Sequence, residues 1–300
     1  MVDVSVVIVN YKTKGLVKEC IKSIKNHTKT VSYEIIVVDN ASEDISELQS
    51  DTVQSVQLKE NVGFGRANNA GANISNGNAL FFLNPDTVLI NEAIDILYDT
   101  LMNVPDCGVC GANLYDVDYN PIHSYYYCTM SLKHALRCAT MAEKRIHHIS
   151  NQHNFEDELK SVDYITGADL MIRKNLFCEI GGFNPGIFMY YEDVDLCSKV
   201  RNRHKKCYSV PKAKIQHLEG QSFTPSQSNQ EIIRRRKSQM SGDSIAVFLR
   251  SNYKRYHYNA ILSANILILR LKLVSYKIIS KDQSGAKQQL DFFKYIRSRI

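Results

Sequence analysis

Short apolar runs alternate with segments of helical periodicity through the first two-thirds of the chain. Residues 4–9 (VSVVIV), 34–38 (EIIVV) and 79–83 (ALFFL) are nearly continuous apolar runs, typical of strands buried on both faces. Residues 16–24 and 93–101 carry apolar side chains at helical spacing. This order indicates βαβ units, and we expect an α/β fold with a mixed, mostly parallel central sheet flanked by helices.

Weaker signals continue the pattern toward residue 210. The segment 53–58 reads as a further strand, 108–112 as a short buried strand or turn, 163–173 as two strands broken at Gly167-Ala168, and 207–210 as another strand. Residues 119–160 are aromatic, rich in histidine and irregular, so we interpret them as an insertion or a mobile lid. Their histidines lack carboxylate or cysteine companions at fixed spacing, which disfavours a metal site there.

Polar residues stand where the first two predicted strands end. Asn10 and Tyr11 follow the first strand, and Asp39 ends the second. A βαβ unit places these two strand ends side by side, which makes a crevice of mononucleotide size. Asp39 can accept a hydrogen bond from a base or a ribose hydroxyl there. The alternative is a helix cap or Asx turn.

The tetrapeptide 84–87 (NPDT) follows the third buried run. Proline cannot donate a ladder hydrogen bond, so we expect the strand to stop before it and to leave Asp86 on a turn at the carboxyl end. Ligands bind at such ends in open α/β sheets, and a carboxylate oxygen suits a hard divalent cation. The alternative is a turn that Asn84 and Asp86 only cap.

Three carboxylates, Glu192, Asp193 and Asp195, open a later helical segment. Carboxylates at a helix N-terminus stay ionised, which suits a general base, and simple capping is the alternative. His217 lies just past a predicted strand; a lone histidine of this kind is usually structural.

The segment 61–71 (NVGFGRANNAG) places two glycines and several amides at the start of a helix, an arrangement that suits anions. It lacks the third glycine of the dinucleotide fingerprint and does not follow the first strand, which disfavours a Rossmann NAD site. Arg66 has an alternative interpretation as a solvated helix residue.

Charge is unevenly distributed along the chain. Residues 1–200 hold 16 Lys and Arg against 26 Asp and Glu, whereas residues 201–300 hold 21 against 5. A basic tail favours an anionic partner such as ligand phosphates, nucleic acid or lipid headgroups. Residues 260–279 are strongly apolar but are interrupted by cations, so they suit a helix in a headgroup layer better than a spanning helix. The alternative is packing on the catalytic domain or on a second subunit.

Eight scattered cysteines and an N-terminus without a secretory leader favour a reducing cytosol. We therefore expect a cytoplasmic protein. We also expect the tail to attach it peripherally to the inner face of the cytoplasmic membrane.

Seven blocks over residues 1–225 resemble, in order, those of one enzyme family. They are VSVVIVNY (4–11), EIIVVDNAS (34–42), NVGFGRANNAG (61–71), FFLNPDT (81–87), ITGADLMIRK (165–174), IGGFNPGIFMYYEDVDLC (180–197) and HLEGQS (217–222). The chain resembles the family 2 inverting glycosyltransferases of GT-A fold, in their bacterial rhamnosyltransferase-like branch. The tail past residue 225 matches this family weakly.

The resemblance implies roles for residues in these blocks. Asp86 takes the last position of the family's D-x-D motif and, with His217, would bind Mg²⁺ or Mn²⁺; Asn84 replaces the first carboxylate and leaves a less anionic site. Asp193 would deprotonate the acceptor hydroxyl, and Glu192 would orient the acceptor. The implied nucleotide-sugar site comprises Asn10, Tyr11, Asp39, Asn61, Gly63, Arg66, Asn69, Asn84, Asp86 and Gly167.

The implied organisation is a GT-A catalytic domain over residues 1–225 and a basic helical extension over 226–300. Within the catalytic domain we expect a nucleotide-sugar half (about 1–115), the insertion or lid (about 119–160) and an acceptor half (about 160–225).

The implied reaction is hexosyl transfer in bacterial cell-envelope polysaccharide synthesis. The donor would be dTDP-rhamnose or a similar sugar, with UDP-sugars open, and the acceptor a hydroxyl of a surface glycan or a polyprenyl-linked glycan. A homodimer is also open.

Two other classes of function remain as alternatives. One is a nucleotide-sugar-binding protein without turnover, or a sugar nucleotidyltransferase. The other is a nucleic-acid-binding module that uses the tail. Nucleic-acid binding by the tail would not explain why residues 1–225 contain Asp86, Asp193 and His217 together. We therefore expect no nucleic acid partner.

Overall fold

The computed structural model of the chain describes residues 2–126, 152–218, 230–278 and 282–300. These residues divide into two compact units. The first unit contains residues 2–126, 152–188 and 192–218, and the second contains residues 189–191, 230–278 and 282–300.

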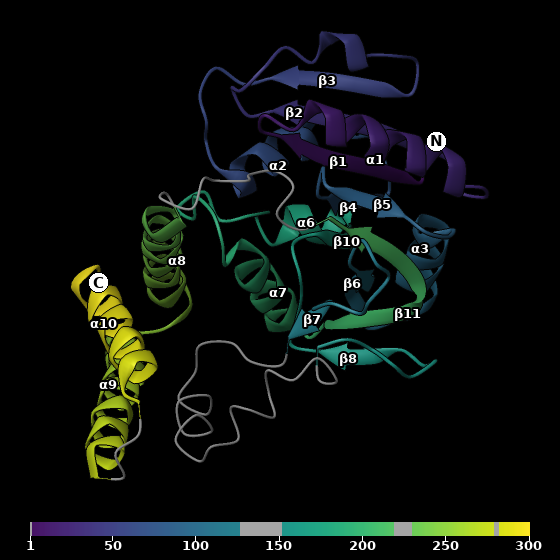
Figure 1. Ribbon diagram of the computed structural model, residues 1–300. Helices are drawn as coiled ribbons and strands as arrows, with labels where there is room; N and C mark the ends of the chain where they lie inside the picture. The colour runs from purple at the N-terminus through teal and green to yellow at the C-terminus, as the bar shows by residue number, and fades with distance from the viewer. Residues whose placement is uncertain (1, 127–151, 219–229, 279–281) are drawn as a thin grey trace. The chain divides into compact units, whose positions relative to one another are not determined.

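The first unit is built on a mixed nine-stranded sheet with strand order β3-β2-β1-β4-β10-β6-β11-β5, in which β8 also pairs with β11 (Figure 1). Strands β3, β2, β1, β4, β6 and β11 run in one direction, and β10, β5 and β8 run in the other. The strands are β1 (Val4–Asn10), β2 (Tyr33–Asp39), β3 (Val53–Gln57), β4 (Ala79–Leu83), β5 (Thr87–Leu89), β6 (Cys107–Tyr115), β8 (Lys160–Val162), β10 (Asp169–Arg173) and β11 (Lys206–His217). A second, two-stranded sheet joins β7 (Tyr125–Tyr126) to β9 (Tyr164–Ile165).

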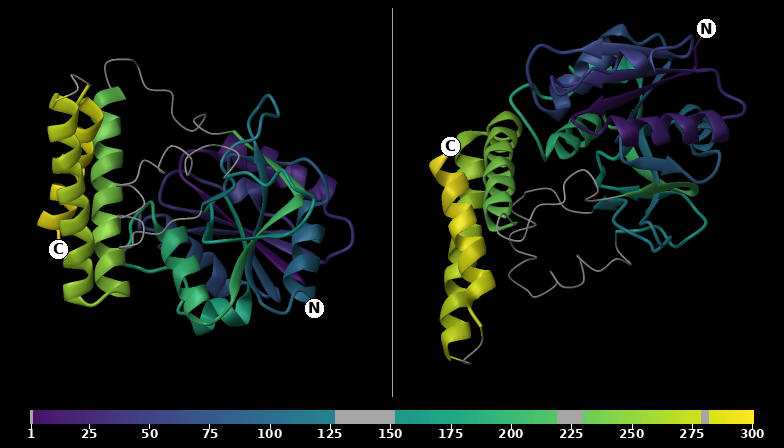
Figure 2. Two further views of the ribbon diagram at one scale, coloured as in Figure 1. Left: turned by 90° about the horizontal axis from the view of Figure 1, so that it is seen from below. Right: turned by 45° about the horizontal axis from the view of Figure 1, so that its top comes forward.

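Helices cover both faces of the large sheet (Figure 2). Helices α1 (Lys14–His27) and α3 (Ala93–Asn103) pack on one face, and α2 (Phe64–Ile74), α6 (Lys174–Glu179) and α7 (Glu192–Asn202) pack on the other. A single turn of 3₁₀ helix, η1 (Ser46–Leu48), precedes β3. Because side chains alternate along a strand, neighbouring residues such as Phe81 and Phe82 of β4 enter opposite cores, and both are fully buried. The α/β prediction from the sequence is confirmed.

Several sequence-predicted boundaries match the observed elements closely. Strand β4 ends at Leu83, before Pro85, as a residue without an amide donor requires. The break at Gly167-Ala168 separates β9 from β10. The segment 108–112, left open as strand or turn, belongs to the nine-residue strand β6.

Strand β11 is irregular partway along its length. It pairs in parallel with β6, where Val210 faces Ala112 but Lys214 faces Asn113. Residues 211–213 are therefore extra relative to β6. Beyond them β11 continues to His217, which pairs with Thr87 of β5.

The second unit contains three long helices, α8 (Gln230–Asn252), α9 (Arg255–Ile278) and α10 (Ser284–Ser298). Helix α10 packs against both α8 and α9 (Figure 2). On α8, Asp243 accepts a hydrogen bond from the Tyr295 hydroxyl at 3.0 Å and pairs with Arg299 Nε at 2.6 Å. In the described part of the chain, each helix is too short or too polar to cross a bilayer.

The expected insertion over residues 119–160 is described only in part. His147 and His148 fall outside the described residues. His153 is buried, its Nδ1 lies 3.1 Å from the Ile122 carbonyl oxygen, and burial lowers its pKa. These contacts give His153 a structural role.

Candidate active site

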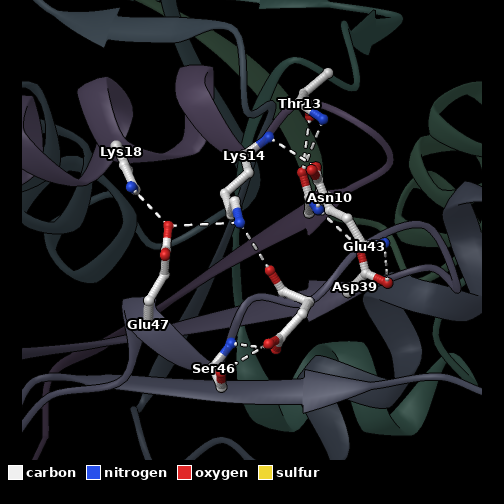
Figure 3. A network of polar contacts seen from close by, with 9 residues as sticks. Asn10, Thr13, Lys14, Lys18, Asp39, Glu43, Ser46 and Glu47 are labelled. Atoms are coloured by element: carbon white, nitrogen blue, oxygen red, sulfur yellow. Dashed lines mark hydrogen bonds and ion pairs between the residues drawn. The ribbon is translucent and has the colours of Figure 1, made fainter.

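Asn10 and Asp39 lie side by side where β1 and β2 end. The two residues are register partners, and Asn10 Nδ2 donates to Asp39 Oδ1 at 2.7 Å (Figure 3). Both residues are fully buried. The juxtaposition expected from a βαβ unit is therefore present. We call Asn10, Asp39 and their loop 40–43 the nucleoside corner, after the ligand that the sequence resemblance implies for it.

Hydrogen-bond donors surround the Asp39 carboxylate. Oδ1 accepts from Asn10 Nδ2 and the Ser42 hydroxyl, and Oδ2 accepts from the Ser42 amide at 2.7 Å and from Gln57 Nε2. Burial by itself raises the pKa of Asp39, but the bonds from Ser42 and Asn10 outweigh it and hold the pKa below its usual value. Asp39 is a saturated anion that orders the loop after β2.

Glu43 belongs to this corner as well, although the sequence analysis did not single it out. Its Oε1 accepts from the Lys14 amide at 2.9 Å and from Asn10 Nδ2 at 3.1 Å (Figure 3). Glu43 therefore caps the N-terminus of α1, where Thr13 makes no side-chain cap. The signal available was its position directly after the block 34–42 that contains Asp39.

Tyr11 is the exposed aromatic residue of this region. Its residue surface is 46% exposed, and the Lys12 ammonium lies 5.6 Å from the centre of its ring. Lys12 adopts a left-handed backbone with φ of 60°, which turns the chain sharply after β1. The ring offers a flat apolar face beside the nucleoside corner.

The loop before α2 is held from both sides. Asn61 Oδ1 accepts from Asn40 Nδ2 at 2.9 Å and from the Gly63 amide at 3.0 Å. Gly63 has φ of 88°, and a Cβ built there would lie 2.2 Å from the Phe188 carbonyl oxygen. That oxygen accepts from the Phe64 amide at 2.9 Å. Only glycine satisfies both the left-handed backbone and the close approach.

Arg66 and Asn69 contact the segment 183–188, which leads toward α7. Asn69 forms a reciprocal pair with Phe183: its Nδ2 donates to the carbonyl at 2.8 Å, and its Oδ1 accepts from the amide at 3.0 Å. Arg66 Nε donates to the Pro185 carbonyl at 2.6 Å, and the residue is exposed. These two predicted site residues therefore hold the segment that leads to the acidic pair of α7, Glu192 and Asp193.

A second group of polar side chains lies where β4 ends. His217 Nε2 lies 3.3 Å from Asp86 Oδ1 and 3.4 Å from Asn84 Nδ2. Backbone bonds fix the group, since the Leu218 amide donates to the Asp86 carbonyl and the Asn84 amide to the Ala168 carbonyl, both at 2.8 Å. We call Asn84, Asp86 and His217 the rim triad. Residues 133 positions apart thus meet as the sequence predicts.

The rim triad suits a divalent cation by its chemistry. A carboxylate oxygen and an imidazole nitrogen are common ligands, and an amide side chain can turn its oxygen inward. Asp86 and His217 expose only 12% and 11% of their side chains, so an ion there would be partly shielded from water. In the described residues, no set of three His, Cys, Asp or Glu forms a richer site.

Asp193 lies beside this group, across the turn that precedes β10. Its Oδ2 accepts from the Gly167 amide at 3.0 Å, and Ala168, the next residue, accepts from Asn84. Burial raises the pKa of Asp193, although bonds from Val194 and Gly167 oppose the rise. The result is a carboxylate with increased affinity for a proton, held at the same edge of the sheet as the rim triad.

Glu192 is a buried carboxyl with an oxygen that no donor contacts. It is 8% exposed, and its Oε2 makes no hydrogen bond. Burial, together with the neighbouring charge of Asp193, raises the pKa of Glu192 to about 8. An acid with this pKa remains largely protonated at neutral pH and can donate a hydrogen bond.

Asp169 is a further buried acid that the sequence did not single out. It is fully buried at the start of β10, where the Ala112 amide of β6 donates to its Oδ2. Burial raises its pKa well above the usual value. Through this bond Asp169 links β10 to β6 behind the Gly167-Ala168 turn.

Comparisons with known proteins agree with this geometry. The sequence profile described as "Glycosyl transferase family 2" matches residues 5–193. A "Low-salt glycan biosynthesis hexosyltransferase Agl10" from Haloferax volcanii is 28% identical over 210 residues, which are 67% of this chain and 62% of that protein. An "N-acetylglucosaminyl-diphospho-decaprenol L-rhamnosyltransferase" from Mycobacterium tuberculosis is 27% identical over 142 residues, 46% of each chain. The chain thus spans less than two thirds of either relative.

A solved structure shares the fold at lower sequence similarity. It is the mannosyltransferase PcManGT from Pyrobaculum calidifontis in complex with GDP-Man and Mn²⁺, with a TM-score of 0.56 and 14% identity. The match covers 99% of this chain and 85% of that one. The profile covers more than half of the sequence and the α/β architecture agrees with it, so the chain belongs to glycosyl transferase family 2 and has the fold of a GT-A glycosyltransferase.

Proposed function

We propose that the protein transfers a hexosyl group, with inversion, from a nucleotide-diphosphate sugar to a hydroxyl of a glycan acceptor. The observation that carries the proposal is the meeting of the rim triad and Asp193 around one turn, next to the nucleoside corner. A transferase needs these three parts together: a place for the nucleoside, positive charge for the diphosphate and a base for the acceptor.

The nucleoside corner supports donor binding. Tyr11 offers a face on which a base can stack, and Asn10 and Asp39 lie buried beside it, where they hold the ends of β1 and β2 together. Asn61 and Gly63 shape the loop on the other side. Because Asp39 is already saturated, its contribution to a bound nucleoside includes holding the loop 40–43 in place. Arg66 and Asn69 hold the segment that closes the site toward α7.

Asn84, Asp86 and His217 would hold Mg²⁺ or Mn²⁺ against the diphosphate. When bound, the ion supplies charge neutralisation to the leaving nucleoside diphosphate. With one carboxylate instead of two, the triad carries less negative charge than a D-x-D pair, and we expect it to bind the ion mainly together with the donor. The PcManGT structure holds GDP-Man and Mn²⁺ in a related fold, which supports this proposal.

The acidic pair of α7 supports an inverting reaction. Asp193 takes the proton of the acceptor hydroxyl while the acceptor oxygen bonds to the anomeric carbon. The bond from that carbon to the diphosphate breaks, and the nucleoside diphosphate leaves with the electron pair. Glu192, largely protonated at neutral pH, donates a hydrogen bond that orients the acceptor. A raised pKa makes Asp193 a better base near neutral pH.

We further propose a rhamnose-like donor, dTDP-linked or UDP-linked, and a lipid-linked surface glycan as acceptor. The similarity to a rhamnosyltransferase whose name specifies a diphospho-decaprenol acceptor supports both choices. The C-terminal unit supplies the contact with a membrane that such an acceptor requires. The protein then works in the cytoplasm at the inner surface of the membrane, as a catalytic domain over 1–225 with an extension over 226–300.

A thermal-shift panel tests the donor site. We expect one nucleotide sugar to raise the melting temperature, more so with Mn²⁺, because a ligand that binds only the folded state stabilises it. Asp86→Ala and His217→Ala should remove the Mn²⁺-dependent part and leave the metal-free part. An identical metal-dependent shift in both variants would exclude the rim triad as the ion site. A panel without any shift would contradict the proposed function.

A further inference from the structure

The outward face of α9 carries a row of large apolar side chains. Leu267, Leu271, Val274 and Ile278 expose 57%, 61%, 59% and 78% of their surface. An α-helix advances about 100° per residue, so these four positions fall within an arc of about 60°. Single exposed apolar residues are ordinary on a protein surface, whereas a continuous row marks an interaction site. We call these four residues the outer stripe.

Helix α9 already has a buried apolar face on its other side. Ile261 and Leu262 are buried, and Ile266 and Leu269 form a small core with Leu290 of α10. The packing of α9 within its own unit is therefore satisfied without the outer stripe. A helix that is apolar on two sides normally has both sides covered.

The charges on α9 are of one sign. The helix contains Arg255, Arg270, Lys272 and Lys277 and no aspartate or glutamate. Arg270 and Lys277 are exposed and fall at one border of the outer stripe, about 60–80° from Leu267 on a helical projection. Long basic side chains can lay their stems on apolar surface and extend their charged ends toward a polar layer.

We propose that the outer stripe is a docking surface for an anionic lipid bilayer, on which α9 lies in the plane of the headgroups. The apolar side chains would enter the acyl boundary while Arg270 and Lys277 meet lipid phosphates. The helix does not meet the requirements for crossing a membrane, which agrees with an in-plane position. A second copy packed stripe to stripe would bring equal cations together, which disfavours that occupant.

This inference deepens the proposed function, since it names the surface that brings the active site to a lipid-linked acceptor. Its test does not depend on catalysis, because vesicle binding is measured without donor or acceptor. The Leu267→Ser/Val274→Ser double variant keeps all residues of the buried face of α9. It also leaves every residue of the nucleoside corner and the rim triad unchanged.

The experiment is flotation of the full chain with vesicles of phosphatidylcholine, with and without phosphatidylglycerol, at low and high salt. We expect binding to the anionic vesicles that weakens as salt increases. The double variant should bind about a hundredfold more weakly, since each lost apolar side chain is worth about tenfold. Arg270→Gln/Lys277→Gln should weaken binding to anionic vesicles only. Val117→Ser, at a residue of the first unit that is 50% exposed, is the matched control and should bind like the unchanged chain.

Three outcomes would overturn the proposal. The first is that the unchanged chain does not bind anionic vesicles, and the second is that the double variant binds them equally well. The third is that the double variant converts a dimer to a monomer while vesicle binding persists. The last would assign the outer stripe to a second copy. Retained thermal stability of the variants shows that the helices still fold. A donor-induced thermal shift that survives in a variant without vesicle binding separates this surface from the donor site.

Discussion

The nucleoside corner and the acidic pair of α7 both bury carboxylates at the same edge of one sheet, and they treat them in opposite ways. Asp39 is surrounded by donors from Asn10, Ser42 and Gln57, and its pKa is lowered. Glu192 has an oxygen without a hydrogen bond, and its pKa is raised to about 8. Saturation makes a carboxylate a fixed structural anion. Burial without saturation makes it a group that holds and releases protons, as catalysis requires.

The largest effect expected from this contrast follows from Asp193→Asn. The amide oxygen can still accept from Gly167, so the fold and donor binding should persist, while the proposed base is lost. We expect the transfer rate to fall by about 10²–10⁴, the usual contribution of a general base. Single-turnover transfer and donor affinity measured together check this. Asp106→Asn, which removes a surface carboxylate paired with Lys206, is the control and should transfer at the original rate. Undiminished transfer by Asp193→Asn would show that another group takes the proton.

The stability of a Glu192 variant tests the contrast between Glu192 and Asp39 directly. Glu192→Gln should stabilise the protein at neutral pH, because the unfolded chain releases this proton near pH 4.5 and the folded chain only near pH 8. The stability that the native Glu192 contributes therefore falls as pH rises between these values. At pH 7 the variant should gain about 3 kcal/mol at most, seen as a melting temperature several degrees higher, while acceptor use declines.

The gain from Glu192→Gln should shrink as pH falls toward 4.5 and vanish below it, where both states hold the proton. Denaturation curves from pH 4 to 8 check this dependence. A constant difference across this range would mean that Glu192 does not titrate as its burial implies.

The smallest effect, of opposite sign, is expected for Asp39→Asn. The substitution replaces an acceptor oxygen with an NH₂ group that faces donors from Ser42 and Gln57, which should cost about 1–3 kcal/mol at neutral pH. The pKa of Asp39 is lowered in the folded state, so its stabilising effect is present above the unfolded pKa and is lost as pH falls through the lower folded value. The difference between variant and original should therefore vanish only in acid. Urea titrations at pH 7 and pH 3 measure it.

The sequence predicts the sheet edge well because local rules operate there. Unbroken apolar runs mark β1, β2 and β4, proline ends β4 before Asp86, and a cluster of acids opens α7. What it misses are contacts between distant segments. The Asn69 bonds to Phe183 and the approach of Gly63 to the Phe188 carbonyl join residues more than 100 positions apart. No local pattern encodes such pairs.

The short strand β5 and the role of Glu43 escape prediction for related reasons. Thr87–Leu89 is too short for periodicity and becomes a strand only because β11 supplies a partner. Glu43 caps a helix that precedes it in sequence, which reverses the order that capping rules search. The sequence shows that α9 has apolar residues on two sides. Which of these sides is buried becomes clear only from the packing of α10 against it.

The three extra residues of β11 set the parity of that strand. Side chains alternate between the two faces of a sheet, and an odd insertion before Lys214 reverses which residues of the remaining strand point to each face. A one-residue slip in the pairing of residues 214–217 would turn the His217 imidazole away from Asp86. The place of His217 in the rim triad thus depends on residues 211–213, a segment that lies outside the triad.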